Sequence, residues 1–74
     1  RFIHIQFKEE RNGAYKMIGT YAKTARGRMA KYLLQEKIDT RSGIQAFSED
    51  GYSFNPSLSG SHTFIFTRNI NTTS

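Results

Sequence analysis

The sequence predicts an α+β domain with the element order β-β-α-α-β-β and antiparallel hairpins. Three observations carry this prediction: alternating apolar and polar residues near both ends, an Asn12-Gly13 dipeptide between two such stretches, and a long proline-free segment in the middle. With 74 residues, of which 36% are hydrophobic, the chain can bury only a thin core. We therefore expect one domain that forms part of a larger single domain.

The first hairpin follows from its alternation and its turn. Ile3 to Lys8 alternates as a half-buried strand does, and Asn12-Gly13 tolerates the positive φ values of a type I′ turn. Residues 14–21 then continue as the second strand. A two-residue loop predicts the register Arg11 with Ala14, Glu9 with Lys16, Phe7 with Ile18 and Ile5 with Thr20. The pair Glu9 and Lys16 is expected to close an apolar cluster near the tip.

The segment from Lys23 to Lys37 predicts the main helix. At about 100° per residue, its inward stripe consists of Ala25, Met29, Tyr32 and Leu33, widened by Ala30 and Leu34. Thr24, Arg28, Lys31 and Gln35 fall on the opposite face. Gly27 indicates a close approach of the helix backbone to a strand or to a ligand.

The second half of the chain predicts a short helix and a second hairpin. Asp39 or Thr40 can cap a helix from Arg41 to Phe47. A strand from Tyr52 to Phe54 is expected to pair with residues 63–67 of a strand from His62 to Arg68. We assign residues 1–70 to the domain and residues 71–74 to a polar tail.

Composition excludes several classes of protein. The chain has no cysteine, which rules out a disulfide scaffold, a thiolate zinc site and a cysteine nucleophile. No apolar run approaches the roughly 20 residues that cross a bilayer. The formal net charge of +5 favours an anionic partner.

The candidate site lies at the start of the predicted main helix and consists of Lys23, Thr24, Arg26, Gly27, Arg28 and Lys31. The first backbone N–H groups of a helix and the positive end of its dipole attract anions, and Lys and Arg add charge-assisted bonds to phosphate. Cations there cost the helix some 0.3–1 kcal/mol each, so a sequence that accepts this cost is using the charge. A solvated basic helix face is an equally good explanation.

Other chemistry is poorly supported. Asp39, Glu49, Asp50 and His62 are better explained as caps and surface charges than as a metal or acid–base set, so we expect no catalytic residue, no metal and no cofactor. The four tyrosines could stack on bases but are better explained as core residues.

Phe7 to Arg68 resembles the C-terminal part of the YaaA family of bacterial peroxide-stress proteins. The resemblance rests on the Asn12-Gly13 hairpin, on Tyr-Ala-Lys-x-Ala-Arg-Gly at Tyr21 to Gly27, on Phe-x-x-x-Gly-Tyr-x-Phe at Phe47 to Phe54, and on the closing aromatic strand before Arg68. It implies a cytoplasmic protein, not an established enzyme, that protects against hydrogen peroxide and binds DNA through a basic cleft and a helix-hairpin-helix element. That element is not found in this sequence.

Three hypotheses stay open. The first is non-specific binding of double-stranded DNA, with Lys23, Arg26, Arg28 and Lys31 contacting phosphates and the N-terminal remainder of the protein completing the fold. The second is an enzyme that acts on a small phosphorylated or anionic substrate at the same residues. The third is a purely structural role, in which Arg26 is a buried ion-pair partner. None of them involves a membrane.

Overall fold

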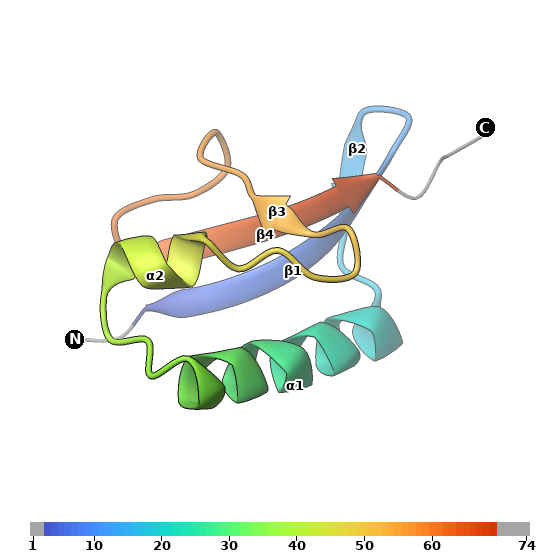
Figure 1. Cartoon of the computed structure of the whole chain (residues 1–74). Coiled ribbons are helices and arrows are strands. Elements are labelled where there is room, and N and C mark those ends of the chain that lie inside the picture. Colours follow the sequence, from blue (N-terminus) through green and yellow to red (C-terminus); the bar gives the residue numbers. More distant parts are fainter. Residues whose placement is uncertain (1–2, 70–74) are drawn as a thin grey trace.

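The computed structural model describes residues 3–69 and shows a four-stranded sheet with two helices. The elements in chain order are β1 (His4–Arg11), β2 (Ala14–Lys16), α1 (Gly19–Gln35), α2 (Arg41–Gln45), β3 (Ser53–Phe54) and β4 (Thr63–Asn69). The strand order is β2-β1-β4-β3. Figure 1 shows β1 and β4 side by side, α1 running along β1, and α2 near the C-terminal end of α1. The α+β prediction is therefore confirmed.

Both predicted hairpins form. Asn12 and Gly13 have φ values of 54° and 81°, as the turn requires, and Arg11 pairs with Ala14 and Glu9 with Lys16. β3 pairs antiparallel with β4, with Phe54 opposite Phe66, which confirms the second predicted pairing.

The centre of the sheet was not predicted. β1 and β4 lie parallel, in register from His4 opposite Thr63 to Glu10 opposite Asn69. The first and last strands of the described chain thus lie next to each other and join the two hairpins into one mixed sheet.

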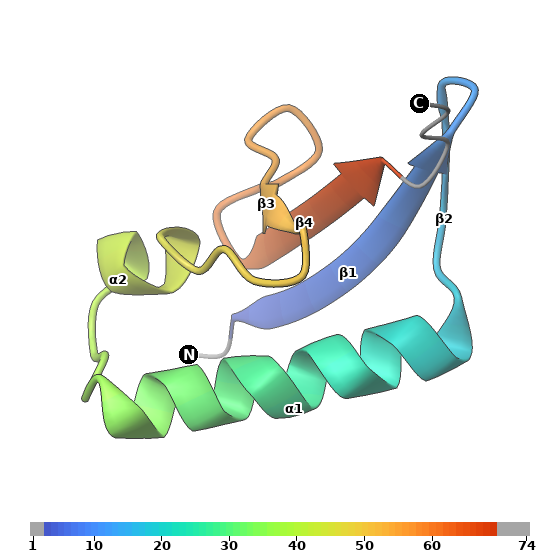
Figure 2. The same ribbon diagram turned by 45° about the vertical axis from the view of Figure 1, so that its right-hand side comes forward.

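The prediction that residues 14–21 form one long strand is wrong. β2 ends at Lys16, and α1 begins at Gly19 with an extended Ile18 before it, so the expected pairs of Phe7 with Ile18 and Ile5 with Thr20 do not form. Figure 2 shows the chain leaving the hairpin and turning directly into α1. The earlier helix start brings Ala22 into the core, where it is 1% exposed.

Aromatic rings dominate the core between the sheet, α1 and the segment that follows α2. Phe7, at the centre of β1, stacks on Phe66 and meets Phe47 and Tyr52 edge to face. The small side chains of α1 let the helix approach β1 closely, and the buried cluster consists of Phe7, Ala22, Ala25, Met29, Phe47, Tyr52, Phe64 and Phe66. Leu34 does not widen the inward stripe as predicted, because it is 78% exposed.

The second helix is shorter than predicted. Thr40 caps it by accepting a hydrogen bond from the Gly43 amide over 3.1 Å, as one of the two expected caps. The helix ends at Gln45, which leaves Phe47 free to turn into the core. The Tyr32 hydroxyl donates to the Gly43 carbonyl over 2.7 Å and ties α2 to α1. The predicted tail, residues 71–74, lies outside the described residues.

Candidate functional site

The predicted site residues lie on α1, but not at its start. Because the helix begins at Gly19, Lys23 is already in its second turn, and Lys31 lies three turns along. The Ala22 amide already donates to the Ile18 carbonyl over 2.8 Å, so the free amides belong to residues 19–21. The predicted placement of these cations among free backbone amides is therefore wrong: the free amides lie about one turn before the first cation, and the candidate site consists of side chains.

Those side chains form a basic band on the outward face of the helix. Lys23, Thr24, Arg26, Gly27, Arg28 and Lys31 are all exposed, and α1 contains no acidic residue. At about 100° per residue, Lys23 and Lys31 lie within about 80° of each other, with Gly27 between them. Arg26 and Arg28 lie about 160° apart, on the two flanks. The band is convex, so its charges do not converge on one point.

The cations of the band differ in their partners. Arg28 forms an exposed ion pair with Asp50, with 2.6 Å between Nε and Oδ2. Within residues 3–69, Lys23, Arg26 and Lys31 have no ion pair. The described residues therefore do not provide the buried ion pair that the structural hypothesis expected for Arg26.

The two uncharged members of the band have simple surroundings. The Thr24 hydroxyl donates to the Thr20 carbonyl over 3.2 Å, so its oxygen is left as an acceptor. A Cβ atom on Gly27 would meet nothing within 4 Å. The described chain therefore makes no close approach to Gly27, and the space above it is open to a ligand.

A hollow of about 140 Å³ lies on one flank of the band. Arg28 and Lys31 line it together with Tyr32, Gln35 and Glu49. Two of the predicted residues thus share a small concave surface, which an acidic side chain also enters.

Sequence reasoning missed a buried polar cluster at Glu9. Glu9 is 2% exposed; Arg68 Nε donates to its Oε1 over 2.6 Å, and the Tyr52 hydroxyl donates to its Oε2. The expected pair of Glu9 with Lys16 is present in the strand register, but the carboxylate pairs with Arg68 instead. A signal for this existed: Glu9 follows the core-facing residues Ile5 and Phe7 at the same parity of β1.

Aromatic rings complete the cluster. The Arg68 guanidinium carbon lies 4.5 Å from the centre of the Tyr52 ring and 5.0 Å from that of Tyr21. Burial, followed by the hydrogen bond to Glu9, raises the pKa of Tyr52 far above its usual value. Tyr52 therefore stays protonated and serves as a fixed donor.

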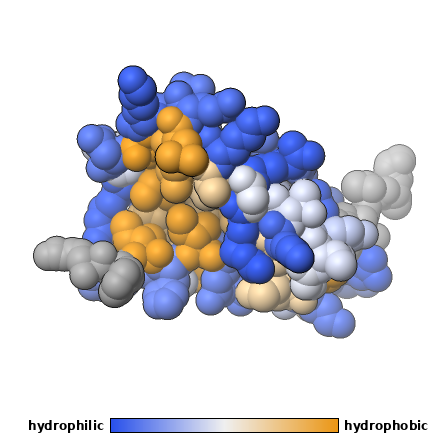
Figure 3. Space-filling model, turned by 90° about the horizontal axis from the view of Figure 1, so that it is seen from below, coloured by the Kyte–Doolittle hydropathy of each residue, from blue (hydrophilic) through white to orange (hydrophobic). Residues whose placement is uncertain are grey.

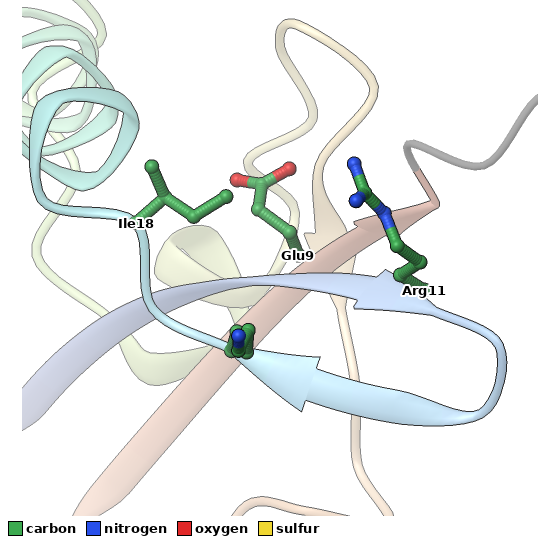
Figure 4. A pocket seen from close by; sticks show the side chains of 4 residues that line it. Glu9, Arg11 and Ile18 are labelled. Atoms are coloured by element: carbon green, nitrogen blue, oxygen red, sulfur yellow. The ribbon is translucent and has the colours of Figure 1, made fainter.

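A second hollow, of about 180 Å³, opens beside this cluster between the first hairpin and the start of α1. Glu9, Arg11, Lys16 and Ile18 line it, and Figure 4 shows the Glu9 carboxylate between Ile18 and Arg11. The Glu9 charge is already compensated by Arg68. The mouth of this hollow therefore carries a net positive charge.

Within residues 3–69, no group of three or more His, Asp or Glu side chains could hold a metal ion. None of the described helices has the length and apolarity that crossing a membrane requires.

Comparisons with known proteins point to one family. The family model described as "Peroxide stress protein YaaA" matches residues 1–58. The chain is 48% identical over 69 residues to a UPF0246 protein of Acaryochloris marina and 46% identical over 68 residues to a UPF0246 protein of Francisella tularensis subsp. novicida. These matches cover 93% and 92% of this chain but 27% of each relative, so the chain spans about a quarter of their length.

Proposed function

Because the chain belongs to the family of the peroxide stress protein YaaA, we propose that it is the C-terminal part of a cytoplasmic bacterial protein that binds double-stranded DNA and limits oxidative damage. The observation that carries the DNA-binding part is the charge of α1. This 17-residue helix presents four exposed cations and has no acidic residue. Such a surface attracts the phosphate backbone without reading base sequence.

The geometry of the band suits a backbone rather than a single small anion. Lys23 and Lys31 are eight residues apart, which corresponds to about 12 Å along the helix. Phosphates of one DNA strand repeat about every 3.4 Å along the duplex axis, so the two ammonium groups reach different phosphates. The open surface at Gly27 allows the backbone to come close between them.

Arg26 and Arg28 extend the contact to either side. To contact a phosphate, Arg28 must either keep its ion pair with Asp50 as well or break it. Breaking this ion pair costs little free energy, because the Arg28 and Asp50 side chains are 50% and 38% exposed. In this assignment the duplex is positioned by Lys23, Arg26, Arg28 and Lys31. Thr24 lies beside them, and Gly27, which has no side chain, leaves room for the DNA backbone.

The test is the salt dependence of binding to a short DNA duplex. Lys23→Gln with Lys31→Gln removes two phosphate contacts, so the slope of log K against log salt should flatten by about 1.8, or roughly 0.9 per contact. Fluorescence anisotropy at several salt concentrations measures this slope. Lys8→Gln with Lys37→Gln is the matched control, because it removes the same net charge outside the band.

The two variants separate a specific band from bulk charge. The control should leave the slope within about 0.5 of the unsubstituted protein, since it removes no phosphate contact. Equal flattening by both double variants would show attraction by net charge alone, and an unchanged slope in the Lys23 and Lys31 variant would eliminate the proposed interface.

An enzyme acting on a small phosphorylated or anionic substrate is the second candidate, and one observation favours it. The hollow of about 140 Å³ brings Arg28 and Lys31 together beside Gln35 and Glu49. A thermal-shift screen with nucleotides and sugar phosphates tests it. A ligand that raises the Tm of the unsubstituted protein, but not that of Arg28→Gln, would favour this function over DNA binding.

A further inference from the structure

The surface over the C-terminal end of α1 is apolar: Leu33 and Ile44 pack partly against the core, and Leu34 stands exposed beside them. We define the Leu34 surface as Leu33, Leu34, Ile38 and Ile44. Leu34 is 78% exposed, and the other three are half-buried. Figure 3, which views the molecule from the side of α1, shows a continuous apolar area toward this end of the helix.

Contacts between the end of α1 and α2 fix the backbone beneath the Leu34 surface. The Ile38 amide donates to the Leu33 carbonyl over 3.0 Å, and the Tyr32 hydroxyl bonds to the Gly43 carbonyl. Ile38 also lies against Gly43, since a Cβ atom there would come within 2.7 Å of Ile38 Cγ2. These contacts fix α2 against the end of α1, so the apolar side chains form a preformed patch rather than a flexible end.

An ordered apolar patch of this kind marks an interface. Full burial of a leucine side chain stabilises a protein by about 1.5–3 kcal/mol relative to an exposed one. Burial of Leu34 under a further segment would therefore add stability that the described chain lacks. The relatives that match 93% and 92% of this chain are nearly four times as long as the matched segment, which covers 27% of each. We take the additional polypeptide of these longer proteins to be the segment that covers the Leu34 surface.

We propose that the Leu34 surface is the docking face for the part of the longer family protein that lies outside the matched segment. The contact is intramolecular and hydrophobic. At about 100° per residue, Leu34 lies on the same side of α1 as Lys23 and Lys31, about one turn beyond Lys31, so the docked segment lies at the C-terminal end of the basic band. This inference is independent of DNA binding.

The test uses a full-length chimera in which this chain replaces the matching 69 residues of the Acaryochloris marina relative. Leu34→Glu places a charge in the proposed interface and should lower the Tm of the chimera by about 5 °C or more, whereas the neighbouring control Gln35→Glu should shift it by less than about 2 °C. In the 74-residue chain alone, both substitutions should shift Tm by less than about 2 °C, because both side chains are exposed there.

A second variant covers the case in which Leu34→Glu prevents folding of the chimera. Leu34→Cys should be alkylated at least tenfold more slowly in the native chimera than in the chimera unfolded in urea, with the site read by mass spectrometry. Rapid labelling in the native chimera, or equal loss of Tm in the chimera and in the isolated chain, would overturn the proposal. So would protection that disappears when the chimera is diluted from dimer to monomer, because the occupant would then be a second copy.

Discussion

Two arginine–carboxylate pairs in this protein have the same length but different surroundings. Arg68 with Glu9 and Arg28 with Asp50 are both joined over 2.6 Å. Glu9 is 2% exposed and Arg68 23%, whereas the Arg28 and Asp50 side chains are 50% and 38% exposed. Water screens the outer pair, while the inner pair holds a charge that has little access to water.

Removal of one arginine from each pair should therefore have unequal effects. Arg68→Met leaves the buried Glu9 carboxylate without its charge partner, and we expect a loss of about 3–5 kcal/mol in the free energy of unfolding. Arg28→Met should cost less than about 1 kcal/mol. Urea unfolding followed by circular dichroism measures both, and an Arg68→Met protein that is already unfolded without urea meets the expectation. Similar losses in the two variants would contradict the burial argument.

Tyr52 gives the Glu9 cluster a defined pH dependence. Burial and the bond to Glu9 raise the pKa of Tyr52 in the folded protein, while an unfolded tyrosine titrates near about 10. The folded state then binds the proton more tightly, so the stabilising contribution is complete below pH about 10 and decreases as the pH rises above it.

Tyr52→Phe should be less stable than the unsubstituted protein at neutral pH by about 1.5–3 kcal/mol, because Glu9 loses a hydrogen bond. That difference should shrink as the pH rises above about 10, since phenylalanine does not titrate. Urea unfolding across this range measures it, and the other three tyrosines affect both proteins alike. A difference that stays constant or grows with pH would contradict the assignment.

At the scale of elements, Gly27 in α1 and Gly43 in α2 differ in the space around them. In α1, a Cβ atom on Gly27 would meet no atom within 4 Å. In α2, a Cβ atom on Gly43 would lie 2.7 Å from Ile38 Cγ2 and 3.1 Å from the Thr40 cap oxygen. Gly43 is therefore required by packing, and Gly27 is not.

Alanine at these two glycines should have opposite effects on stability. Gly27→Ala should raise the free energy of unfolding by about 0.5–1 kcal/mol, because it removes backbone freedom from the unfolded chain at no steric cost. Gly43→Ala should lower it by about 1–3 kcal/mol through overpacking against Ile38. Thermal unfolding of both variants checks this, and stabilisation by Gly43→Ala would show that the cap region adapts freely.

Elements and hairpin pairings with local signals were predictable, and the pairing between the two hairpins was not. Asn12-Gly13 and the alternation before it indicated the first hairpin, and Thr40 indicated the start of α2. The start of α1 was missed because its N-cap residue is Ile18, which makes no side-chain hydrogen bond to the helix. Its early start depends on burying Ala22 against the sheet, which is a tertiary effect.

At the scale of the whole molecule, the parallel pair of β1 and β4 holds the fold together. Glu9 and Arg68 meet across 59 residues, and so the buried cluster exists only once these strands are paired. Alternation predicts that a strand has a buried face but not which strand lies beside it. This is why the exposed basic residues of α1 could be identified from sequence, whereas the partners of the buried Glu9 could not.

Phe66 lies where this pairing and the core coincide. It is 0% exposed, sits opposite Phe7 in the parallel register, and contacts the rings of Phe7, Phe47 and Phe54. Phe66→Ala should cost about 3–5 kcal/mol, and a core of this size supplies little more than that in total.

We therefore expect Phe66→Ala to unfold the whole chain rather than loosen one strand. The measurement is the dispersion of backbone amide signals in a proton–nitrogen NMR spectrum, which should collapse for residues of both hairpins and α1. Tyr15→Ala on the exposed strand β2 is the control and should keep a dispersed spectrum. A Phe66→Ala spectrum that keeps the signals of β1, β2 and α1 dispersed would show that the first hairpin and helix fold without β4.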